Sequence, residues 1–253
     1  MRVFKFGGAS VKDAASVRNV ANIIRQYGNG PLVVVVSAMG KTTNALERLT
    51  SYYMKQERDS LEACFEEIRS YHFGVAAELF GDDTHKVFPV LEQSFYHLLY
   101  YIREKPGNNY NYEYDRIVST GELVSSQILS HFLNHSGIRN QLFQAQKLVI
   151  TDAHFRDPSV DWILTQRVVK TMLMPYMKPA RGSNKPQVVV TQGFIGGTSQ
   201  GFTTTLGREG SDFSAAILAY SLDANEVTIW KDVPGLLNAD PKLFSETLLL
   251  PNI

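Results

Sequence analysis

The chain has 253 residues, of which 44% are hydrophobic, so it can bury the core of one large α/β domain or of two small ones. Lysine plus arginine number 25, equal to aspartate plus glutamate, and the zero net charge provides no overall attraction to nucleic acid or to an anionic membrane. The single cysteine, Cys64, excludes an internal disulfide framework and a cysteine-based zinc site.

The N-terminal sequence MRVFKFGG lacks the long apolar core of a signal peptide. The aliphatic run at residues 32–36 is too short to span a bilayer. We therefore expect a soluble, cytoplasmic protein that binds neither nucleic acid nor membrane.

The first unit of the chain reads as strand, glycine turn and helix. Residues 3–6 alternate as in a strand, Gly7 and Gly8 end it, and Ser10 is placed to cap the apolar helical repeat that follows. Lys5 lies beside the glycine turn. It is either an exposed strand lysine or a cation that meets a phosphate.

The second unit begins with the apolar run 32–36, which indicates a buried parallel strand. The following GKT (40–42) resembles the end of a P-loop, but Val35 occupies the position where that motif requires glycine, so a Walker A site is rejected. No GxGxxG follows a predicted strand either. Ser37 and Thr43 can bind a ligand, or they belong to an ordinary polar strand–helix connection.

The next part of the chain is mainly helical. Residues 44–79, with a possible break, and residues 87 to about 103 have helical patterns, and the turn-rich insert 105–114 is expected to be a loop. A further helix follows the sequence STGE. Ser119 and Glu122 in that sequence match a capping box, although the same carboxylate at a helix start could hold a substrate ammonium group.

Strand and helix patterns then alternate. Short strands are predicted at 142–144 and 147–150, a helix from 160 to about 177, and strands at 188–190 and 226–230. This alternation predicts a mainly parallel sheet covered by helices on both faces, with ligands at the carboxyl ends of its strands. We expect every loop singled out here to follow a strand.

The glycine-rich stretch 191–212 is the strongest candidate for an anion site. An apolar strand leads into it and a helix follows, an arrangement that can hold phosphate on free backbone N–H groups. The hydroxyls of residues 203–205 and the guanidinium of Arg208 add donors. Ser211 is placed to cap the next helix, and Asp212 in its first turn either compensates the helix dipole or works in catalysis. The alternative for the whole stretch is a glycine-rich surface hairpin.

The candidate site contains no nucleophile–histidine pair, because the six histidines lie outside these motifs. It instead contains three cations and three acids: Lys5, Arg208 and Lys231, and Glu122, Asp212 and Asp232. That inventory suits phosphoryl transfer, which depends on charge neutralisation and in-line positioning. A carboxylate acceptor would need no general base, since it is already ionised at neutral pH.

Several motifs resemble those of aspartate kinases. They run in order along the chain: KFGGAS (5–10), VSAM (36–39) with Thr43 and Asn44, STGE (119–122), TQGFIG (191–196), TTTLGREGSD (203–212), WKDVPG (230–235) and ADPK (239–242). The combination of KFGG, SxGE and TTTLGRxGSD is highly specific, whereas residues 49–115 match weakly.

The resemblance implies the amino acid kinase fold, an αβα sandwich around a mainly parallel sheet. Residues 1–253 would be one catalytic domain, with the nucleotide side formed by roughly residues 187–253. The reaction would be transfer of the ATP γ-phosphate to the β-carboxylate of L-aspartate, the first step toward lysine, methionine and threonine. Its rivals are another member of the fold, such as a glutamate, acetylglutamate or UMP kinase, and a catalytically weak binding subunit.

The resemblance also implies residue roles. Lys5 would stabilise the transferring phosphoryl group and Asp212 would organise the site. The residues implied on the substrate side are Ser37, Thr43, Glu122, which faces the ammonium, Arg208, which clamps a carboxylate, and Ser211. The residues implied on the nucleotide side are Lys5, Gly7, Gly8, Ser10, Lys231, Asp232, Leu237 and Lys242. Mg²⁺ would accompany ATP, held mostly by phosphates and water, and no protein metal site is expected.

The sequence departs from the family pattern at four positions near the nucleotide: Ala9, Lys231, Leu237 and Lys242. The family also continues beyond the position of Ile253, with another nucleotide-contacting segment and then regulatory ACT domains. We therefore expect this chain to be a truncated catalytic domain, with a homoserine dehydrogenase fusion as a further alternative for the whole gene. We expect the full-length protein to be a homo-oligomer.

Overall fold

The computed structural model describes residues 1–81, 83–179, 187–231, 235, 237–239, 243–244 and 246–250. Helices and strands alternate over most of its length. In chain order they are β1 (Arg2–Phe6), η1 (Gly8–Val11), α1 (Ala14–Tyr27), β2 (Leu32–Val36), α2 (Thr42–Lys55), α3 (Arg58–Phe80), α4 (Val87–Arg103), α5 (Tyr110–Val118), α6 (Thr120–His135), β3 (Asn140–Phe143), η2 (Ala145–Lys147), β4 (Ile150–Thr151), α7 (Trp162–Met177), β5 (Val188–Gln192), β6 (Ile195–Thr198), β7 (Thr203–Thr205), α8 (Gly210–Leu222) and β8 (Glu226–Trp230).

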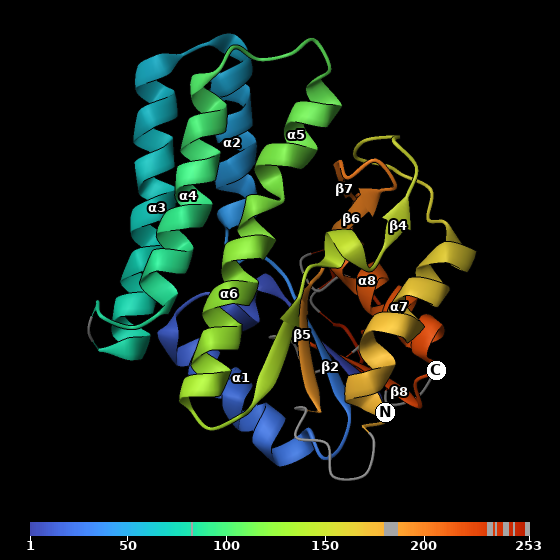
Figure 1. The fold of residues 1–253 in the computed structure, drawn as a ribbon. Helices are drawn as coiled ribbons and strands as arrows, with labels where there is room; N and C mark the ends of the chain where they lie inside the picture. Colours follow the sequence, from blue (N-terminus) through green and yellow to red (C-terminus); the bar gives the residue numbers. More distant parts are fainter. Residues whose placement is uncertain are drawn as a thin grey trace.

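Five strands form a parallel sheet in the spatial order β3-β5-β2-β1-β8 (Figure 1). The register aligns the last residues of four of them: Phe6 pairs with Val36 and with Trp230, and Val36 pairs with Gln192. Because parallel strands end at the same edge, the loops that follow β1, β2, β5 and β8 begin side by side. The predicted parallel α/β sheet is confirmed, and its carboxyl edge is where a site is expected.

The central strand β2 shows why both faces of the sheet are covered. Val34 and Val36 enter a core shared with α1, α6 and the helices that follow β2, whereas Val33 and Val35 enter a second core with α7 and α8. All residues of β2 are buried. The continuous apolar run in the sequence is the consequence of this double burial, and the expected αβα sandwich is present.

Helices α2, α3, α4 and α5 extend beyond the sheet as a bundle, at the upper left of Figure 1. The loop predicted for 105–114 is wrong from Tyr110 onward, because α5 begins there with the Asn109 side chain accepting a hydrogen bond from the Tyr112 N–H at 3.2 Å. Ser119 and Glu122 therefore follow a helix, and the expectation that every site loop follows a strand is wrong here. In the described part of the chain, no helix combines the length and apolar composition needed to cross a membrane.

The glycine-rich stretch forms a hairpin and not an open phosphate loop. Strands β6 and β7 pair antiparallel, and β4 pairs with β6 on the other side. The hydroxyls expected to face an anion are used inside the fold: Thr204 Oγ1 lies 2.8 Å from Thr151 Oγ1, and Thr205 Oγ1 donates to Asp115 Oδ1 at 2.5 Å. The stretch thus contains the hairpin of the alternative interpretation, but this hairpin is largely buried and not on the surface, and the residues that follow it lead into α8.

The glycine turn after β1 differs from its prediction in one detail. Ser10 lies in the short helix η1, and Asp13 caps α1 by accepting a hydrogen bond from the Ser16 N–H at 2.7 Å. The strand, turn and helix are otherwise as predicted. The turn keeps Gly7 and Gly8 at the carboxyl edge of the sheet, next to the loop that follows β2.

Candidate active site

A cleft of about 630 Å³ opens at the carboxyl edge of the sheet, where the loops after β1, β2 and β5 meet helices α2, α5, α6 and α8. Its lining residues come from distant parts of the chain: Lys5, Ser37, Thr43, Glu47, Tyr114, Glu122, Arg156, Asp157, Phe194, Thr205, Gly207, Arg208, Glu209, Gly210, Ser211 and Asp212. The structure thus brings together every residue that the sequence placed on the substrate side.

The charged centre of the cleft is Asp212 between two lysines. Lys5 Nζ lies 2.6 Å from Asp212 Oδ1, and Lys231 Nζ lies 3.1 Å from Oδ2. Lys5 is buried at the end of β1, while Lys231 is about half exposed after the neighbouring strand β8. Burial of Asp212 opposes its ionisation, but hydrogen bonds and positive charge from both lysines outweigh burial and lower the pKa of this carboxyl. Asp212 is therefore a fixed anion that orients two cations.

Close packing sets the start of α8. A Cβ on Gly193, just after β5, would come within 2.6 Å of Ser211 Cβ, so only glycine lets the strand end approach the helix this closely. Glu209, with φ 56°, takes the N-cap position and its side chain makes no capping hydrogen bond, so the predicted capping role of Ser211 is wrong. Ser211 instead lines the cleft beside Asp212.

Glu122 is a buried carboxyl with one oxygen left unpaired. Its Oε1 accepts a hydrogen bond from the Ala38 N–H at 3.1 Å, and its buried Oε2 has no hydrogen-bond partner in the described structure. Burial raises the pKa of Glu122 to about 8, against the lowering effect of backbone N–H groups. The capping box predicted for Ser119 and Glu122 does not form, because Ser119 has helical backbone angles and donates its hydroxyl to the Arg116 carbonyl.

The loop after β2 and the start of α2 form another wall of the cleft. Ser37 and Thr43 line the cleft as predicted. Gly8 packs against this loop: a Cβ there would lie 2.9 Å from the Ala38 carbonyl oxygen and 3.0 Å from that of Gly40. This backbone contact fixes the position of Ala38, whose N–H donates a hydrogen bond to Glu122.

The residues predicted on the nucleotide side are placed less completely. Lys5 is in the cleft, Lys231 reaches Asp212, and Ser10 Oγ donates to the Trp230 carbonyl at 3.4 Å. Leu237 pairs with Leu249 in an isolated bridge away from the cleft lining. Asp232 and Lys242 lie outside the described residues.

Comparison with known proteins decides the family. The family model described as the amino acid kinase family matches residues 1–253. The chain belongs to the amino acid kinase family. Lysine-sensitive aspartokinase 3 of Escherichia coli is 32% identical over 244 residues, covering 96% of this chain and 51% of that protein. The chloroplastic bifunctional aspartokinase/homoserine dehydrogenase of Daucus carota is 32% identical over 258 residues, covering 99% of this chain and 27% of that protein.

The fold of this amino acid kinase is also similar to solved aspartokinase structures. The E. coli aspartokinase III crystal structure in complex with aspartate and ADP (R-state) superposes with a TM-score of 0.88 at 30% identity, over 99% of this chain and 53% of that one. The chain spans about half, or about a quarter, of the length of the curated relatives it matches.

Arg156 is a cleft residue of this amino acid kinase that sequence reasoning missed. It lies in the turn after β4 with φ 71°, its N–H donates to Asp115 Oδ2 at 2.9 Å, and its guanidinium carbon lies 4.2 Å from the Tyr114 ring centroid. Tyr114 is held in turn by Glu47, which accepts from its hydroxyl at 2.7 Å. The only sequence signal for Arg156 is a basic residue in a polar turn after a short strand, and such residues are common on surfaces.

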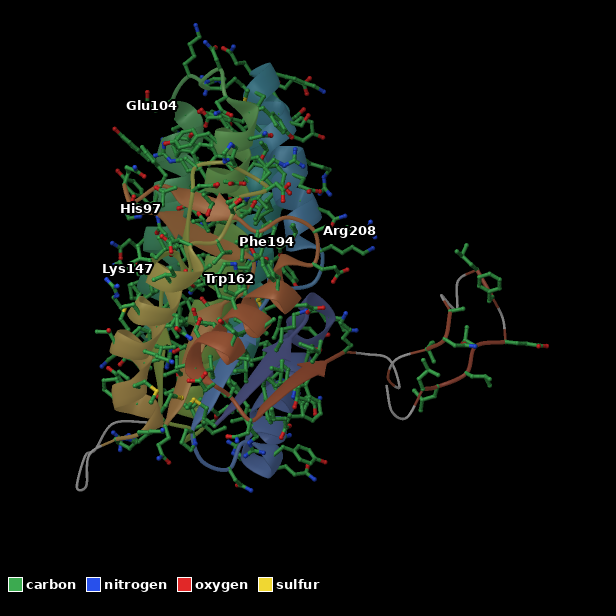
Figure 2. All side chains as sticks on the ribbon, turned by 90° about the vertical axis from the view of Figure 1, so that its right-hand side faces the viewer. His97, Glu104, Lys147, Trp162, Phe194 and Arg208 are labelled. Atoms are coloured by element: carbon green, nitrogen blue, oxygen red, sulfur yellow. The ribbon has the colours of Figure 1, made fainter. Side chains whose placement is uncertain are left out.

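Arg208 and Arg156 give the cleft two guanidinium groups. Figure 2 shows Arg208 projecting at the margin of the molecule, near Phe194, and both residues line the cleft. Asp115, which holds the Arg156 backbone, is fully buried, and burial raises its pKa to about 6 although hydrogen bonds from Thr205 and Arg156 lower it. Because Arg208 and Arg156 are positively charged and one oxygen of Glu122 lacks a partner among the described residues, the cleft can bind anions at its rim and a cation at Glu122.

Proposed function

We propose that this amino acid kinase is an ATP-dependent phosphotransferase that phosphorylates the β-carboxylate of L-aspartate, giving 4-phospho-L-aspartate. The observation that carries the proposal is the unpaired Oε2 of Glu122 in a cleft that also holds Arg208 and the Lys5–Asp212 pair. L-Aspartate offers one ammonium and two carboxylates, which complement these groups. Similarity to aspartokinases, one of them solved with aspartate and ADP, supports the same substrates.

The ammonium of the substrate pairs with Glu122. A buried carboxyl whose second oxygen lacks a partner carries a desolvation cost, and a bound cation removes that cost. Ser37 and Thr43 line the same part of the cleft and offer hydroxyls to the substrate. Pairing favours the ionised form of Glu122, so binding displaces its proton.

The carboxylates of the substrate are oriented by arginine. The planar fork of Arg208 suits the α-carboxylate, since guanidinium binds carboxylate through two parallel hydrogen bonds. Arg156, fixed by its stacking on Tyr114, adds positive charge on the same side. With its α-carboxylate and ammonium held, the substrate presents its β-carboxylate toward Lys5.

Phosphoryl transfer then requires charge neutralisation and no general base. The β-carboxylate is ionised at neutral pH and attacks the γ-phosphorus, while ADP leaves with the bridging oxygen. Lys5 and Lys231, oriented by Asp212, neutralise charge on the transferring group. The nitrogen of Lys5 is fixed before the reaction begins.

Mg²⁺ arrives with the nucleotide in this proposal. Within the described residues, no group of three or more His, Cys, Asp or Glu side chains is arranged to hold a metal ion. Both oxygens of Asp212 face lysines, which leaves the phosphates and water as the main ligands. Bound Mg²⁺ would screen the phosphate charge that the two lysines also oppose. Roles for the biosynthesis of lysine, threonine and methionine, a homo-oligomeric full-length protein and a cytoplasmic location stay predictions.

An acyl-phosphate trap tests the proposal. The chain is incubated with ATP, Mg²⁺ and hydroxylamine, with L-aspartate, L-glutamate, N-acetylglutamate or UMP as acceptor, and hydroxamate and ADP are measured. We expect aspartate-dependent hydroxamate with ADP in equal amount. Preference for another acceptor would contradict the substrate, and aspartate binding without product would favour a binding subunit.

A further inference from the structure

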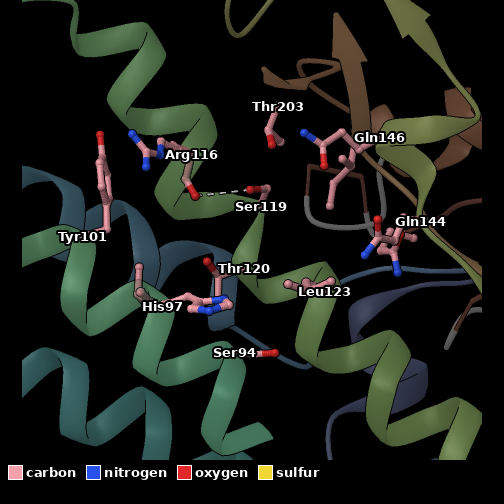
Figure 3. Close-up of a pocket in the computed structure, with 13 residues that line it drawn as sticks. Ser94, His97, Tyr101, Arg116, Ser119, Thr120, Leu123, Gln144, Gln146 and Thr203 are labelled. Carbon is pink, nitrogen blue, oxygen red and sulfur yellow. Dashed lines mark hydrogen bonds between the residues drawn. The ribbon is translucent and has the colours of Figure 1, made fainter. Parts of the chain in front are cut away.

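A second cavity lies behind the wall of the reaction cleft. It has a volume of about 250 Å³, and none of its described lining residues also lines the cleft. The residues around it, most of them labelled in Figure 3, are Ser94, His97, Leu98, Tyr101, Arg116, Ser119, Thr120, Leu123, Gln144, Gln146, Gln192, Ile195 and Thr203. They come from α4, α5, α6, the segment after β3, the end of β5 and the β6–β7 hairpin.

The charge of this cavity is one-sided. Among the described residues that line the cavity, Arg116 is the only one with a permanent charge, and none is an aspartate or a glutamate. The Arg116 guanidinium carbon lies 3.7 Å from the Tyr101 ring centroid, and Nη1 donates to Tyr112 Oη at 3.2 Å. No carboxylate in the described part of the chain forms an ion pair with it. Arg116 is exposed to solvent, and a cation that is held in place without a direct ion pair favours an anionic ligand.

The remaining walls combine fixed polar groups with a small apolar surface. Gln192 is locked, since its Oε1 accepts from the Ala145 N–H at 2.7 Å and its Nε2 donates to Ser126 Oγ at 2.6 Å. Gln146 Nε2 donates to the Gly201 carbonyl at 2.9 Å, which leaves its oxygen as an acceptor. Figure 3 shows Gln144 and Gln146 across the hollow from Arg116. Leu98, Leu123 and Ile195 supply the apolar part. Such walls suit a short acid that also carries a hydroxyl or a second carboxylate.

The same elements form the wall between the two cavities. Thr120 faces this cavity and Glu122, two residues later in α6, faces the cleft. In β7, Thr203 lines this cavity and Thr205 lines the cleft, and Thr205 is hydrogen-bonded to Asp115. A ligand behind the wall would contact the segments that position the reaction cleft.

We propose that this cavity is a second ligand site, for a small hydroxy- or dicarboxylic acid held by Arg116, and that its occupation alters substrate binding in the cleft. The binding part stands independently of the proposed kinase activity. Only the coupling part rests on it.

Calorimetric titration with L-malate and succinate tests the binding, with neutral succinamide as the uncharged control. Because a dicarboxylate could also enter the reaction cleft, the titration is run on wild type, Arg116→Gln and Arg208→Gln. We expect saturable binding of an acid, but not of succinamide, that survives Arg208→Gln and weakens about tenfold or more in Arg116→Gln. Binding lost in Arg208→Gln and retained in Arg116→Gln would place the acid in the cleft and overturn the proposal, as would no saturable binding.

Two further variants guard against misfolding of Arg116→Gln. Arg103→Gln removes an exposed arginine from the end of α4, outside both cavities, and should bind the acid as wild type does. Gln144→Trp changes an exposed position at the rim, and its ring should block the acid while the unfolding temperature is kept. Unchanged affinity in Gln144→Trp would contradict the location. A saturating acid should shift the aspartate KM at least threefold, and an unchanged KM would remove the coupling part alone.

Discussion

The two ends of the reaction cleft differ in how their charges are balanced. At one end, Asp212 is paired with both Lys5 and Lys231 before any ligand binds. At the other end, Glu122 is buried with one oxygen unpaired and a pKa raised to about 8 by burial. The phosphoryl end is thus preorganised, while the recognition end becomes balanced only when a cation enters. In the proposed reaction, the first end performs the chemistry and the second end selects the substrate.

Breaking the preorganised end should have the largest effect. We expect Lys5→Met to lower kcat about a thousandfold, because charge on the transferring phosphoryl group loses a fixed cation. Lys231 still pairs with Asp212 in this variant, so the unfolding temperature should change little. Lys55→Met, at the exposed end of α2, is the matched control. A kcat within tenfold of wild type would remove Lys5 from the chemistry.

Neutralising the recognition end should act on affinity. We expect Glu122→Gln to raise the aspartate KM about 10–100-fold with a smaller change in the ATP KM, since a hydrogen-bonded ion pair with the ammonium is lost. Steady-state kinetics with each substrate varied measures the split, and Glu62→Gln on the exposed face of α3 is the control. An unchanged aspartate KM would leave Glu122 a purely structural residue.

The pH dependence sharpens the same comparison. Burial raises the pKa of Glu122 to about 8, so its ionised fraction rises from about 3% at pH 6.5 to half at pH 8. Because only the carboxylate pairs with ammonium, we expect the aspartate KM to fall roughly tenfold over this window and the slope to vanish in Glu122→Gln. A flat wild-type profile would contradict the raised pKa.

As pH rises, the stability of the ligand-free chain should fall, whereas its affinity for aspartate should rise. The folded-state pKa of Glu122 lies above its ordinary value of 4.5, so between these values the folded chain holds a proton that the unfolded chain has lost. The stabilising contribution of this group is complete below pH 4.5 and declines as pH rises toward 8. Urea unfolding of wild type and Glu122→Gln at pH 6 and pH 8 isolates this contribution. The free energy of unfolding of wild type, relative to that of the variant, should decrease from pH 6 to pH 8.

The smallest effect is expected at Arg156. Its φ of 71° is unfavourable for a residue with a side chain, so Arg156→Gly should stabilise the fold by about 1 kcal/mol. The same change removes a guanidinium from the cleft and should raise the aspartate KM about threefold to fivefold, as expected for an exposed charge. Arg156→Lys retains the charge and the strain. A Gly variant with lower stability and unchanged KM would show that Arg156 serves only the fold.

The parts predicted from sequence are those in which local pattern and tertiary role coincide. The apolar run 32–36 predicts a strand buried on both faces, and the glycine and charge motifs locate Lys5 and Asp212 at the ends of elements that meet. The failures arise where tertiary contacts override local preference. Ser119 matches a cap, yet its N–H already donates to the Asp115 carbonyl, so no free helix end exists there.

The remaining misses have the same origin. Residues 203–205 look like free hydroxyl donors, but Thr151 on β4 and the buried Asp115 use two of these hydroxyls. Arg156 enters the cleft because its backbone is held at positive φ by that same carboxylate and its side chain stacks on Tyr114. None of these contacts has a short-range signal, since the partners lie 41 or more positions apart in the chain.

Proton release on aspartate binding tests the central claim most directly. Titration calorimetry with L-aspartate at pH 7, in two buffers of different ionisation enthalpy, counts the protons displaced. Glu122 is then mostly protonated, so we expect close to one proton released per aspartate bound by wild type and almost none by Glu122→Gln. Aspartate binding with no proton release in wild type would show that its ammonium does not pair with Glu122 and would contradict the assignment of the two ends of the cleft.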